Sequence, residues 1–267
     1  MMKKTLTILA IAGLLGIPAH LSAQRAKTGN PVLPEFHADP EILYAKQTKK
    51  YYIYSTTDGT PGWGGYYFTV FSSKDLTDWR HEGIMLDLGT DQVKWSDGNA
   101  WAPCIIEKKI DGKYKYFFYY SGNAGNAKAI GVAVADSPTG PFVDLGHPIV
   151  NKRPAGLKNG QQIDVDVFND PDTGIDYLYW GNGYMAGARL NPDMTSIDTT
   201  TLKLMTPRGG SLSDYKYREA PYVFKRNGLY YFLWSVDDTG SPNYHVVYGT
   251  SKSPLGPIEV AKDLIIL

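Results

Sequence analysis

The 267-residue chain has little of several features that identify common classes of protein. It has one cysteine, Cys104, so no intramolecular disulfide can form, and no cysteine follows the apolar N-terminal segment to carry a lipid anchor. Its 27 basic side chains balance 27 acidic ones, which leaves no electrostatic attraction toward nucleic acid or an anionic membrane. The patterns HExxH and GxxxxGK are also absent, which argues against a zinc-protease or phosphate-loop site.

The one long apolar run lies at the N-terminus, where residues 1–23 have the features of a secretory signal peptide. A basic start precedes an apolar run over residues 6–17, and small side chains end the segment at Ala23. This run is shorter than the roughly 20 residues that a membrane-spanning helix needs. We therefore expect removal of the segment and export of residues 24–267 as the mature domain, to the periplasm or the extracellular space, without further membrane contact.

The chain is rich in aromatic residues, and these recur in four strand-like segments with a period of roughly 60 residues. The segments are KKYYIYST (49–56), GKYKYFFYYSG (112–122), IDYLYWGNG (175–183) and GLYYFLWSV (228–236). Each follows a turn and is typical of a β-strand, and a second strand sequence follows each one. Short strands at this period, with little helical periodicity, predict the blades of an all-β propeller.

A short element precedes each aromatic segment and carries notable residues at a common position of the repeat. The elements are HADPEIL, AWAPCIIEK, QIDVDVFND and REAPYVFKR, and the corresponding residues are Asp39, Trp101 or Ala102, Asp164 and Glu219. Equivalent positions in successive blades of a propeller converge on the central axis. We therefore expect the carboxylates of Asp39, Asp164 and Glu219 to meet there.

Each carboxylate taken alone has a simpler explanation. The proline after Asp39 favours an extended backbone there, and the carboxylate could cap a turn. Asp164 and Asp166 alternate with apolar residues, so both would project from one face of a strand, as at a solvated edge. Glu219 could form a surface ion pair with Arg218. The shared position in the repeat favours a catalytic interpretation, because independent surface carboxylates have no reason to recur there.

On the motifs HADP, WAP, ID and REAPYVFK, taken in order, the sequence resembles glycoside hydrolase family 43 over nearly all of the chain after the N-terminal segment. The resemblance implies a five-bladed β-propeller that hydrolyses arabinose- or xylose-containing glycans. It implies that Asp39 is the general base, that Asp164 tunes the pKa of the acid and orients it, and that Glu219 is the general acid. Val165 stands where proline is common in the family, which keeps Asp166 as an alternative to Asp164.

Inverting hydrolysis of a glycosidic bond suits this set of residues. One protonated carboxyl group donates to the leaving oxygen, and one carboxylate activates water on the opposite face of the sugar, roughly 6.5–9.5 Å away. Glu219 must then carry a proton near neutral pH, beside the negative charge of Asp164. A stiff backbone at the start of the strand would hold Asp39 beside the axis as the base.

Side chains near the carboxylates are expected to bind the sugar, because aromatic rings stack on sugar faces. Trp101 shares the common position in blade two, Trp63 lies on a Gly-rich loop at the rim, and His37 and Tyr217 flank the acids in sequence. No metal ligands and no required cofactor are identified. The resemblance allows a structural calcium ion in the central channel, held partly by a fifth-blade histidine that this sequence does not reveal.

We therefore expect an exported, inverting exo-glycoside hydrolase that releases terminal pentose from plant cell-wall glycans. The phrases YLYWGNGYMAGARL and YGTSKSPLGPIEV are most similar to α-L-arabinofuranosidases. β-Xylosidase and exo-galactanase activity are the alternatives within the family, and a non-catalytic glycan-binding propeller is the alternative outside it. Because four repeats fill the chain, we expect the fifth blade to be missing or incomplete, as in a C-terminally truncated enzyme.

Overall fold

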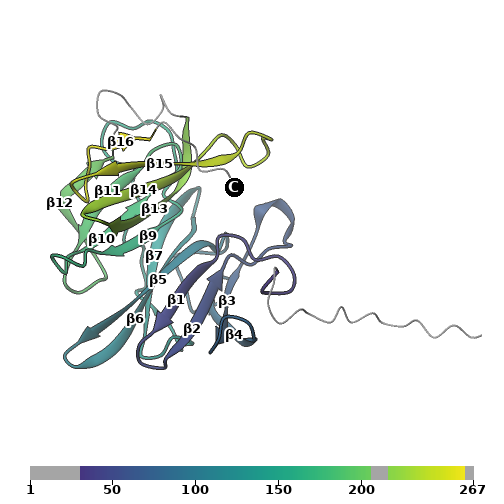
Figure 1. Ribbon diagram of the computed structural model, residues 1–267. Helices are drawn as coiled ribbons and strands as arrows, with labels where there is room; N and C mark the ends of the chain where they lie inside the picture. The colour runs from purple at the N-terminus through teal and green to yellow at the C-terminus, as the bar shows by residue number, and fades with distance from the viewer. Residues whose placement is uncertain (1–30, 206–215, 262–267) are drawn as a thin grey trace, which may run out of the picture.

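The computed structural model describes residues 31–205 and 216–261, which form four antiparallel sheets of four strands each (Figure 1). The first sheet contains β1 (Glu41–Ala45), β2 (Lys50–Ser55), β3 (Tyr67–Ser73) and β4 (Trp79–Asp87). The second contains β5 (Trp101–Ile110), β6 (Lys113–Ala124), β7 (Ala127–Ala135) and β8 (Val143–Asp144). The third contains β9 (Asp166–Asn169), β10 (Asp176–Trp180), β11 (Ala186–Leu190) and β12 (Ile197–Leu204). The fourth contains β13 (Tyr217–Arg226), β14 (Leu229–Val236), β15 (His245–Ser251) and β16 (Glu259–Val260).

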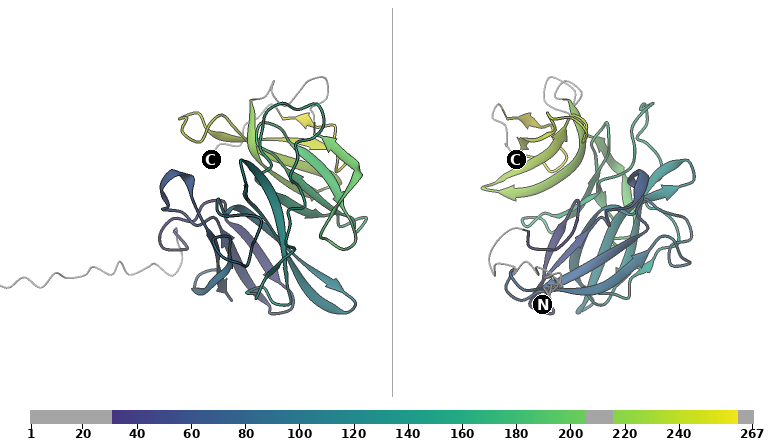
Figure 2. Two further views of the ribbon diagram at one scale, coloured as in Figure 1. Left: turned by 180° about the vertical axis from the view of Figure 1, so that it is seen from behind. Right: turned by 90° about the vertical axis from the view of Figure 1, so that its right-hand side faces the viewer.

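The four sheets are arranged as successive blades of a propeller (Figure 2). Their first strands are innermost, since β5 contacts both β1 and β9, and β9 also contacts β13. The predicted all-β propeller is thus confirmed, and each innermost strand coincides with the short element that precedes an aromatic segment in the sequence. Residues 31–205 and 216–261 contain four blades and no fifth sheet. The only helical element of these residues is the 3-10 turn η1 (Pro61–Trp63). They contain no helix that is long and apolar enough to cross a membrane.

The aromatic segments are the second strands of the blades, and both faces of these strands are buried. Successive side chains of a strand point to opposite faces, so a continuous aromatic run fills two interfaces at once. On β6, Phe118 and Tyr120 join the apolar cluster between the first and second blades, whereas Tyr119 joins the cluster between the second and third. On β10, Trp180 and Tyr179 divide in the same way between the two neighbours of the third blade. Each fully buried ring contributes roughly 2–3 kcal/mol of apolar transfer free energy.

The first and the fourth blade each have one sheet face that packs against no neighbouring blade among the described residues. Ile42 and Tyr44 on β1 and Tyr222 on β13 are each about half exposed. On the fourth blade, Phe224 stacks on Tyr231 with ring centroids 5.0 Å apart. In the other blades, apolar side chains at the corresponding positions pack against a neighbouring blade.

One residue with a left-handed backbone stands at the start of every innermost strand. The φ angle is 48° at Asp39, 37° at Ala102, 57° at Asp164 and 57° at Ala220. The pairing of β5 with β6 and of β13 with β14 shifts register at this position. Such a conformation costs about 1–3 kcal/mol in a non-glycine residue, so the surrounding packing must impose it.

This repeated conformation corrects four expectations. In the fourth blade the equivalent residue is Ala220, and Glu219 lies one residue before it. Asp39 is not extended, although proline follows it; a proline fits here because an irregular ladder needs no backbone donor at that place. The second-blade equivalent of Asp39 is Ala102 rather than Trp101. Asp164 precedes β9 instead of sharing a strand face with Asp166.

Candidate active site

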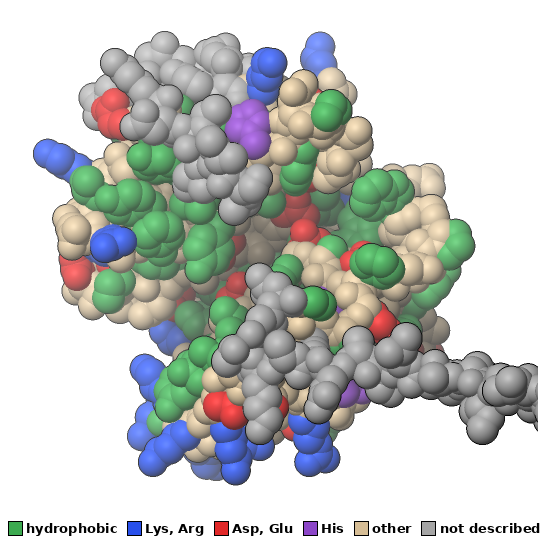
Figure 3. Space-filling model, turned by 45° about the vertical axis from the view of Figure 1, so that its right-hand side comes forward, with side chains coloured by type: hydrophobic (Ala, Val, Ile, Leu, Met, Phe, Trp, Pro, Cys, Tyr) green, Lys and Arg blue, Asp and Glu red, His purple; other side chains and the backbone are tan. Residues whose placement is uncertain are grey.

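A pocket of about 680 Å³ lies where the innermost strands begin, and all three predicted carboxylates line it. Asp39 comes from the first blade, Asp164 from the third and Glu219 from the fourth. Acidic side chains are visible in the central hollow of the face drawn in Figure 3. The convergence that the repeat predicts is therefore present in the structure.

Asp39 is held by a hydroxyl group that bridges two blades. The Thr56 hydroxyl donates to Asp39 Oδ2 at 3.1 Å and accepts the backbone N–H of Ala102 at 2.8 Å. Water reaches Asp39, but protein atoms enclose the carboxylate within the concave wall. Desolvation raises the pKa of Asp39, the Thr56 hydrogen bond opposes this, and the negative charge of Asp58 adds to it. The Asp39 carboxylate that faces the pocket is therefore more basic than that of an ordinary aspartate.

Asp164 is connected to the second and fourth blades. Its backbone N–H donates to Ser121 Oγ at 3.1 Å, and its Oδ2 accepts the backbone N–H of Ala220 at 3.2 Å. Burial raises the pKa of Asp164 well above its usual range, and the negative charges of Glu219 and Asp39 raise it further. Asp164 therefore holds a proton more readily than an ordinary aspartate does.

Glu219 receives hydrogen bonds at both carboxyl oxygens. Asn182 Nδ2 donates to Oε2 at 2.6 Å, and the Tyr244 hydroxyl donates to Oε1 at 3.3 Å. Arg218 Nε is 4.0 Å from Oε2, while its main partner is Asp238 at 2.8 Å. The simple surface ion pair between Arg218 and Glu219 is therefore a minor contact.

Asp166 is not part of the pocket wall. Its Oδ2 accepts the backbone N–H of Val223 at 2.8 Å. Burial raises the pKa of Asp166 to about 7 and that of Glu41 to about 8, and the charge of Asp166 adds to the effect on Glu41. The geometry thus places Asp164, and not Asp166, beside Glu219.

Two of the four predicted sugar-binding residues line the pocket. Trp101 Nε1 donates to the backbone carbonyl of Trp63 at 2.8 Å, which fixes the loop that carries Trp63. The Trp63 side chain is 73% exposed and is free to stack on a ligand. Lys128 Nζ lies 4.2 Å from the centroid of the Trp101 ring and supports it from beside the pocket.

The other two predicted sugar-binding residues lie outside the pocket wall. The ring nitrogens of His37 contact Ser55 Oγ at 3.2 Å and the Pro34 carbonyl at 2.8 Å, and the ring packs edge-on against Phe71. Tyr217 is buried between blades and donates its hydroxyl to the Gly181 carbonyl at 2.8 Å. Both side chains support the segments that hold the carboxylates. His37 lies before β1, and a register shift separates Tyr217 from Glu219 on β13, so neither side chain points the way of the carboxylate two residues later.

Polar residues that the sequence pattern did not single out complete the site. Asn182 stands between two glycines directly after the buried β10, and this combination of a polar residue with a glycine turn was an available signal. Thr56, Asp58 and Tyr244 also line the pocket. Thr56 directly follows β2, but nothing in the sequence distinguishes Tyr244 from other tyrosines in turns.

No group of three or more His, Cys, Asp or Glu side chains in the described residues could hold a metal ion. Glu41 and Asp166, two carboxyl groups of innermost strands outside the pocket, lie near the Cys104 thiol. Calcium takes six to eight oxygen ligands, and a thiol is a poor substitute. These residues do not fit a calcium site.

The propeller brings three carboxyl groups together in a pocket with indole side chains in its wall. These are the groups that a glycoside hydrolase uses. Such enzymes need an acid, a base and a sugar-stacking surface. Comparison with known families supports this class: residues 28–267 match the model of glycosyl hydrolases family 43. The chain belongs to this family.

Known relatives share much of this chain. It is 34% identical to a β-D-galactofuranosidase of Aspergillus niger, over 88% of this chain and 67% of the relative. It is 33% identical to an arabinoxylan arabinofuranohydrolase of Bacillus subtilis, over 70% of this chain and only 40% of the relative. A β-xylosidase/α-arabinofuranosidase from a compost metagenome, solved with xylotriose in a calcium-free form, superposes with a TM-score of 0.71 at 26% identity. That superposition covers 87% of this chain and 79% of the other.

Proposed function

We propose that this chain is an inverting exo-glycoside hydrolase that removes terminal α-L-arabinofuranosyl residues from arabinoxylan-type glycans. One observation carries the proposal: Asp39 and Glu219 face one pocket from different blades and in different environments. Asp39 is reached by water and bound by one hydroxyl, whereas the Glu219 side chain is 14% exposed and bound by Asn182 and Tyr244. A glycan-binding propeller without catalysis would need neither arrangement.

In this mechanism Asp39 is ionised and takes a proton from the attacking water. The Thr56 hydroxyl keeps the carboxylate in place and favours its charged form. The water then attacks the anomeric carbon from the side opposite to the leaving oxygen, so the configuration of the sugar inverts.

Glu219 donates a proton to the leaving oxygen. Burial and the negative charges of Glu219 and Asp39 raise the pKa of Asp164, so a proton is favoured within this group of carboxylates. The mechanism requires that this proton lies on Glu219 when the substrate is bound. Asn182 and Tyr244 orient the carboxyl group and stabilise the carboxylate that remains after proton transfer.

The preference for a furanose ring rests on the relatives. Two of them are named for five-membered sugar rings, arabinofuranose and galactofuranose, and a third combines arabinofuranosidase with β-xylosidase activity. Release of terminal galactofuranose is the second candidate, because the Aspergillus niger relative matches 88% of this chain. β-Xylosidase activity is the third.

A panel of nitrophenyl glycosides tests the substrate. We expect turnover of the α-L-arabinofuranoside to exceed that of the β-D-galactofuranoside, the β-D-xyloside and the β-D-galactoside. Higher turnover of one of the other three would replace the proposed substrate with that sugar.

Two variants test the catalytic roles. Asp39→Asn and Glu219→Gln should each lower kcat by about three orders of magnitude or more while the protein still binds arabinose-containing oligosaccharides. Proton NMR of the first product should show inverted anomeric configuration. Net retention would mean that a carboxylate attacks the sugar, and the assignment of Asp39 as base would be wrong.

Export is part of the proposal and rests on residues 1–23. Expression of the full-length chain in a bacterium with a secretion system should give a protein in the periplasm or medium whose N-terminus, determined by mass spectrometry, follows Ala23. An intact N-terminus on cytoplasmic protein would contradict export.

A further inference from the structure

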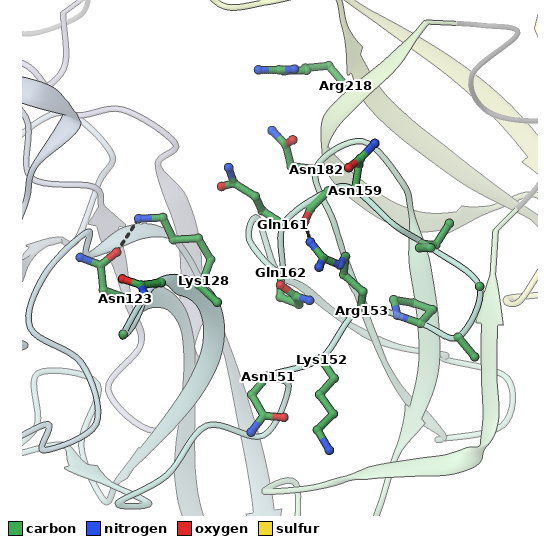
Figure 4. A pocket seen from close by; sticks show the side chains of 18 residues that line it. Asn123, Lys128, Asn151, Lys152, Arg153, Asn159, Gln161, Gln162, Asn182 and Arg218 are labelled. Carbon is green, nitrogen blue, oxygen red and sulfur yellow. Dashed lines mark hydrogen bonds between the residues drawn. The ribbon is translucent and has the colours of Figure 1, made fainter.

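A second pocket, of about 940 Å³, adjoins the active-site pocket and shares Gln161, Asn182 and Arg218 with it. One wall comes from the turn of the β6–β7 hairpin, and the other comes from residues 151–162 (Figure 4). The shared residues lie on the Glu219 side of the active site, because Asn182 donates to Glu219 and Arg218 precedes it. We call this second pocket the basic cleft.

The basic cleft has one sign of charge. Lys128, Lys152, Arg153 and Arg218 line it, and within the described part of the chain its wall contains no Asp, no Glu and no aromatic ring. Figure 4 shows Lys128 with Asn123 on one side of the cleft, and Arg153 with Gln161 and Gln162 on the other. Amide side chains between the cations add further donors and acceptors.

Three of these cations form no ion pair with a carboxylate among the described residues, and two of the three have few other contacts. Arg218 pairs with Asp238, and Lys128 contacts Asn99, Asn123 and the Trp101 ring. The Arg153 guanidinium donates only to the Gly160 carbonyl, at 3.2 Å, which leaves most of its five N–H donors available. Lys152 is exposed on the same wall and forms no ion pair there.

We propose that the basic cleft binds a hexuronic acid residue of the glycan, with its carboxylate held by Arg153 and Lys152. A neutral sugar chain is usually held by stacking on aromatic rings, and this cleft offers none. An arginine that keeps free donors suits a carboxylate, which it can bind through two parallel hydrogen bonds. The cleft therefore selects for negative charge rather than for an apolar sugar face.

The position of the cleft indicates which part of the substrate carries the acidic sugar. This step rests on the proposed function. Glu219 protonates the leaving oxygen, so the leaving part of the glycan lies on the Glu219 side of the active site, where the cleft opens. The acidic residue thus belongs to the polysaccharide that remains after the terminal sugar is released, and the active-site pocket holds the neutral sugar.

The test compares two matched ligands. One is an arabinose-substituted xylo-oligosaccharide that carries a glucuronic acid branch, and the other is the same oligosaccharide after its carboxyl group has been reduced to an alcohol. Calorimetry with the Glu219→Gln variant measures binding without turnover, and kcat/KM of the wild-type protein is measured for both. We expect the acidic ligand to bind about three- to ten-fold more tightly, with the advantage disappearing in high salt.

Charge reversal at two lysines of the same loop locates the effect. Lys152→Glu should abolish the preference for the acidic ligand, in binding and in the ratio of the two kcat/KM values. Lys158→Glu makes the same change of net charge at an exposed position of this loop outside the cleft wall, and should keep the preference. Circular dichroism of both variants checks that the loop change leaves the fold intact.

Equal binding of the two ligands to the protein would overturn the inference, and so would equal effects of Lys152→Glu and Lys158→Glu. Hydrolysis of both ligands at equal rates would refute the acidic preference while the proposed glycosidase activity stands. Binding of the acidic ligand with hydrolysis of neither would refute the proposed activity while the cleft assignment stands.

Discussion

The Thr56 hydroxyl is the most informative single group to remove, because it joins the proposed base to the neighbouring blade. In Thr56→Val the shape of the side chain is kept, but Asp39 Oδ2 loses its donor and the Ala102 N–H loses its acceptor. A hydrogen bond to a charged acceptor contributes about 1.5–3 kcal/mol. One pKa unit corresponds to about 1.36 kcal/mol, so full loss of this bond would raise the pKa of Asp39 by about one to two units.

We expect a shift of about one unit, because water reaches Asp39 and replaces part of the lost bond. The sign follows from the role of the base. Thr56 donates to the ionised carboxylate and so lowers the pKa of Asp39; its removal raises that pKa, and the acid limb of the kcat/KM profile moves to higher pH. The alkaline limb, which reports the acid, should stay in place.

The measurement is kcat/KM for nitrophenyl α-L-arabinofuranoside from about pH 4 to 9, with melting temperatures to follow stability. Thr201→Val is a matched control: the Thr201 hydroxyl also accepts a backbone N–H, from Arg189 at 2.9 Å, and donates to the Asp198 carbonyl at 2.8 Å, but on the outermost strand of its blade. Both variants should lose about 1–2 kcal/mol of stability. An acid limb of Thr56→Val that does not move, or that moves to lower pH, would refute the reasoning.

Three further changes have expected outcomes. Asp58→Asn removes the negative charge that raises the pKa of Asp39, so the acid limb should move to lower pH by up to about one unit in the same assay; movement in the other direction would contradict the charge effect. Trp101→Ala should raise KM about ten-fold or more with a smaller change in kcat, as measured on arabinoxylo-oligosaccharides, because the ring is part of the pocket wall. Asp170→Asn should lower the free energy of unfolding by about 2–3 kcal/mol at pH 7, measured in urea, since Asp170 is 1% exposed and contacts Lys225 Nζ at 2.9 Å. Burial opposes ionisation of Asp170, but hydrogen bonds from Lys225 and its other partners outweigh burial and lower its pKa to about 2; the stabilisation is therefore full above about pH 4, and the difference between variant and wild type should vanish as the pH falls through 2.

The fold was predictable because the blades repeat one pattern. Burial of both faces makes each second strand a continuous aromatic run, and four such runs at one period indicate a propeller. The meeting of Asp39 and Asp164 was predictable for the same reason, and Glu219, one residue before the equivalent position, also lines their pocket. The positive φ of Asp39 was not, because proline favours an extended residue before it, and the packing of four innermost strands overrides this local preference.

The polar partners of the carboxylates were harder to predict. Asn182 and Tyr244 reach Glu219 from the third blade and from a turn of the fourth, and no sequence period relates them to it. His37 and Tyr217 show the opposite error. Each lies two residues before a pocket carboxylate and would share its side of a regular strand, but His37 lies before β1 and a register shift intervenes at Tyr217. Contacts between blades depend on how the sheets pack, and a single strand pattern does not contain that information.

Each of the three carboxylate residues is connected by hydrogen bonds to at least one other blade. Asp39 is joined through Thr56 to the second blade, Asp164 to the second and the fourth, and Glu219 to the third. No single blade, and no pair of blades, holds a complete set of supported groups. Hydrolytic activity should therefore report the integrity of the whole molecule. During denaturation it should vanish with the first blade that detaches, ahead of any signal that averages over the remaining β-structure, so an enzyme assay in urea can measure how cooperatively the blades come apart.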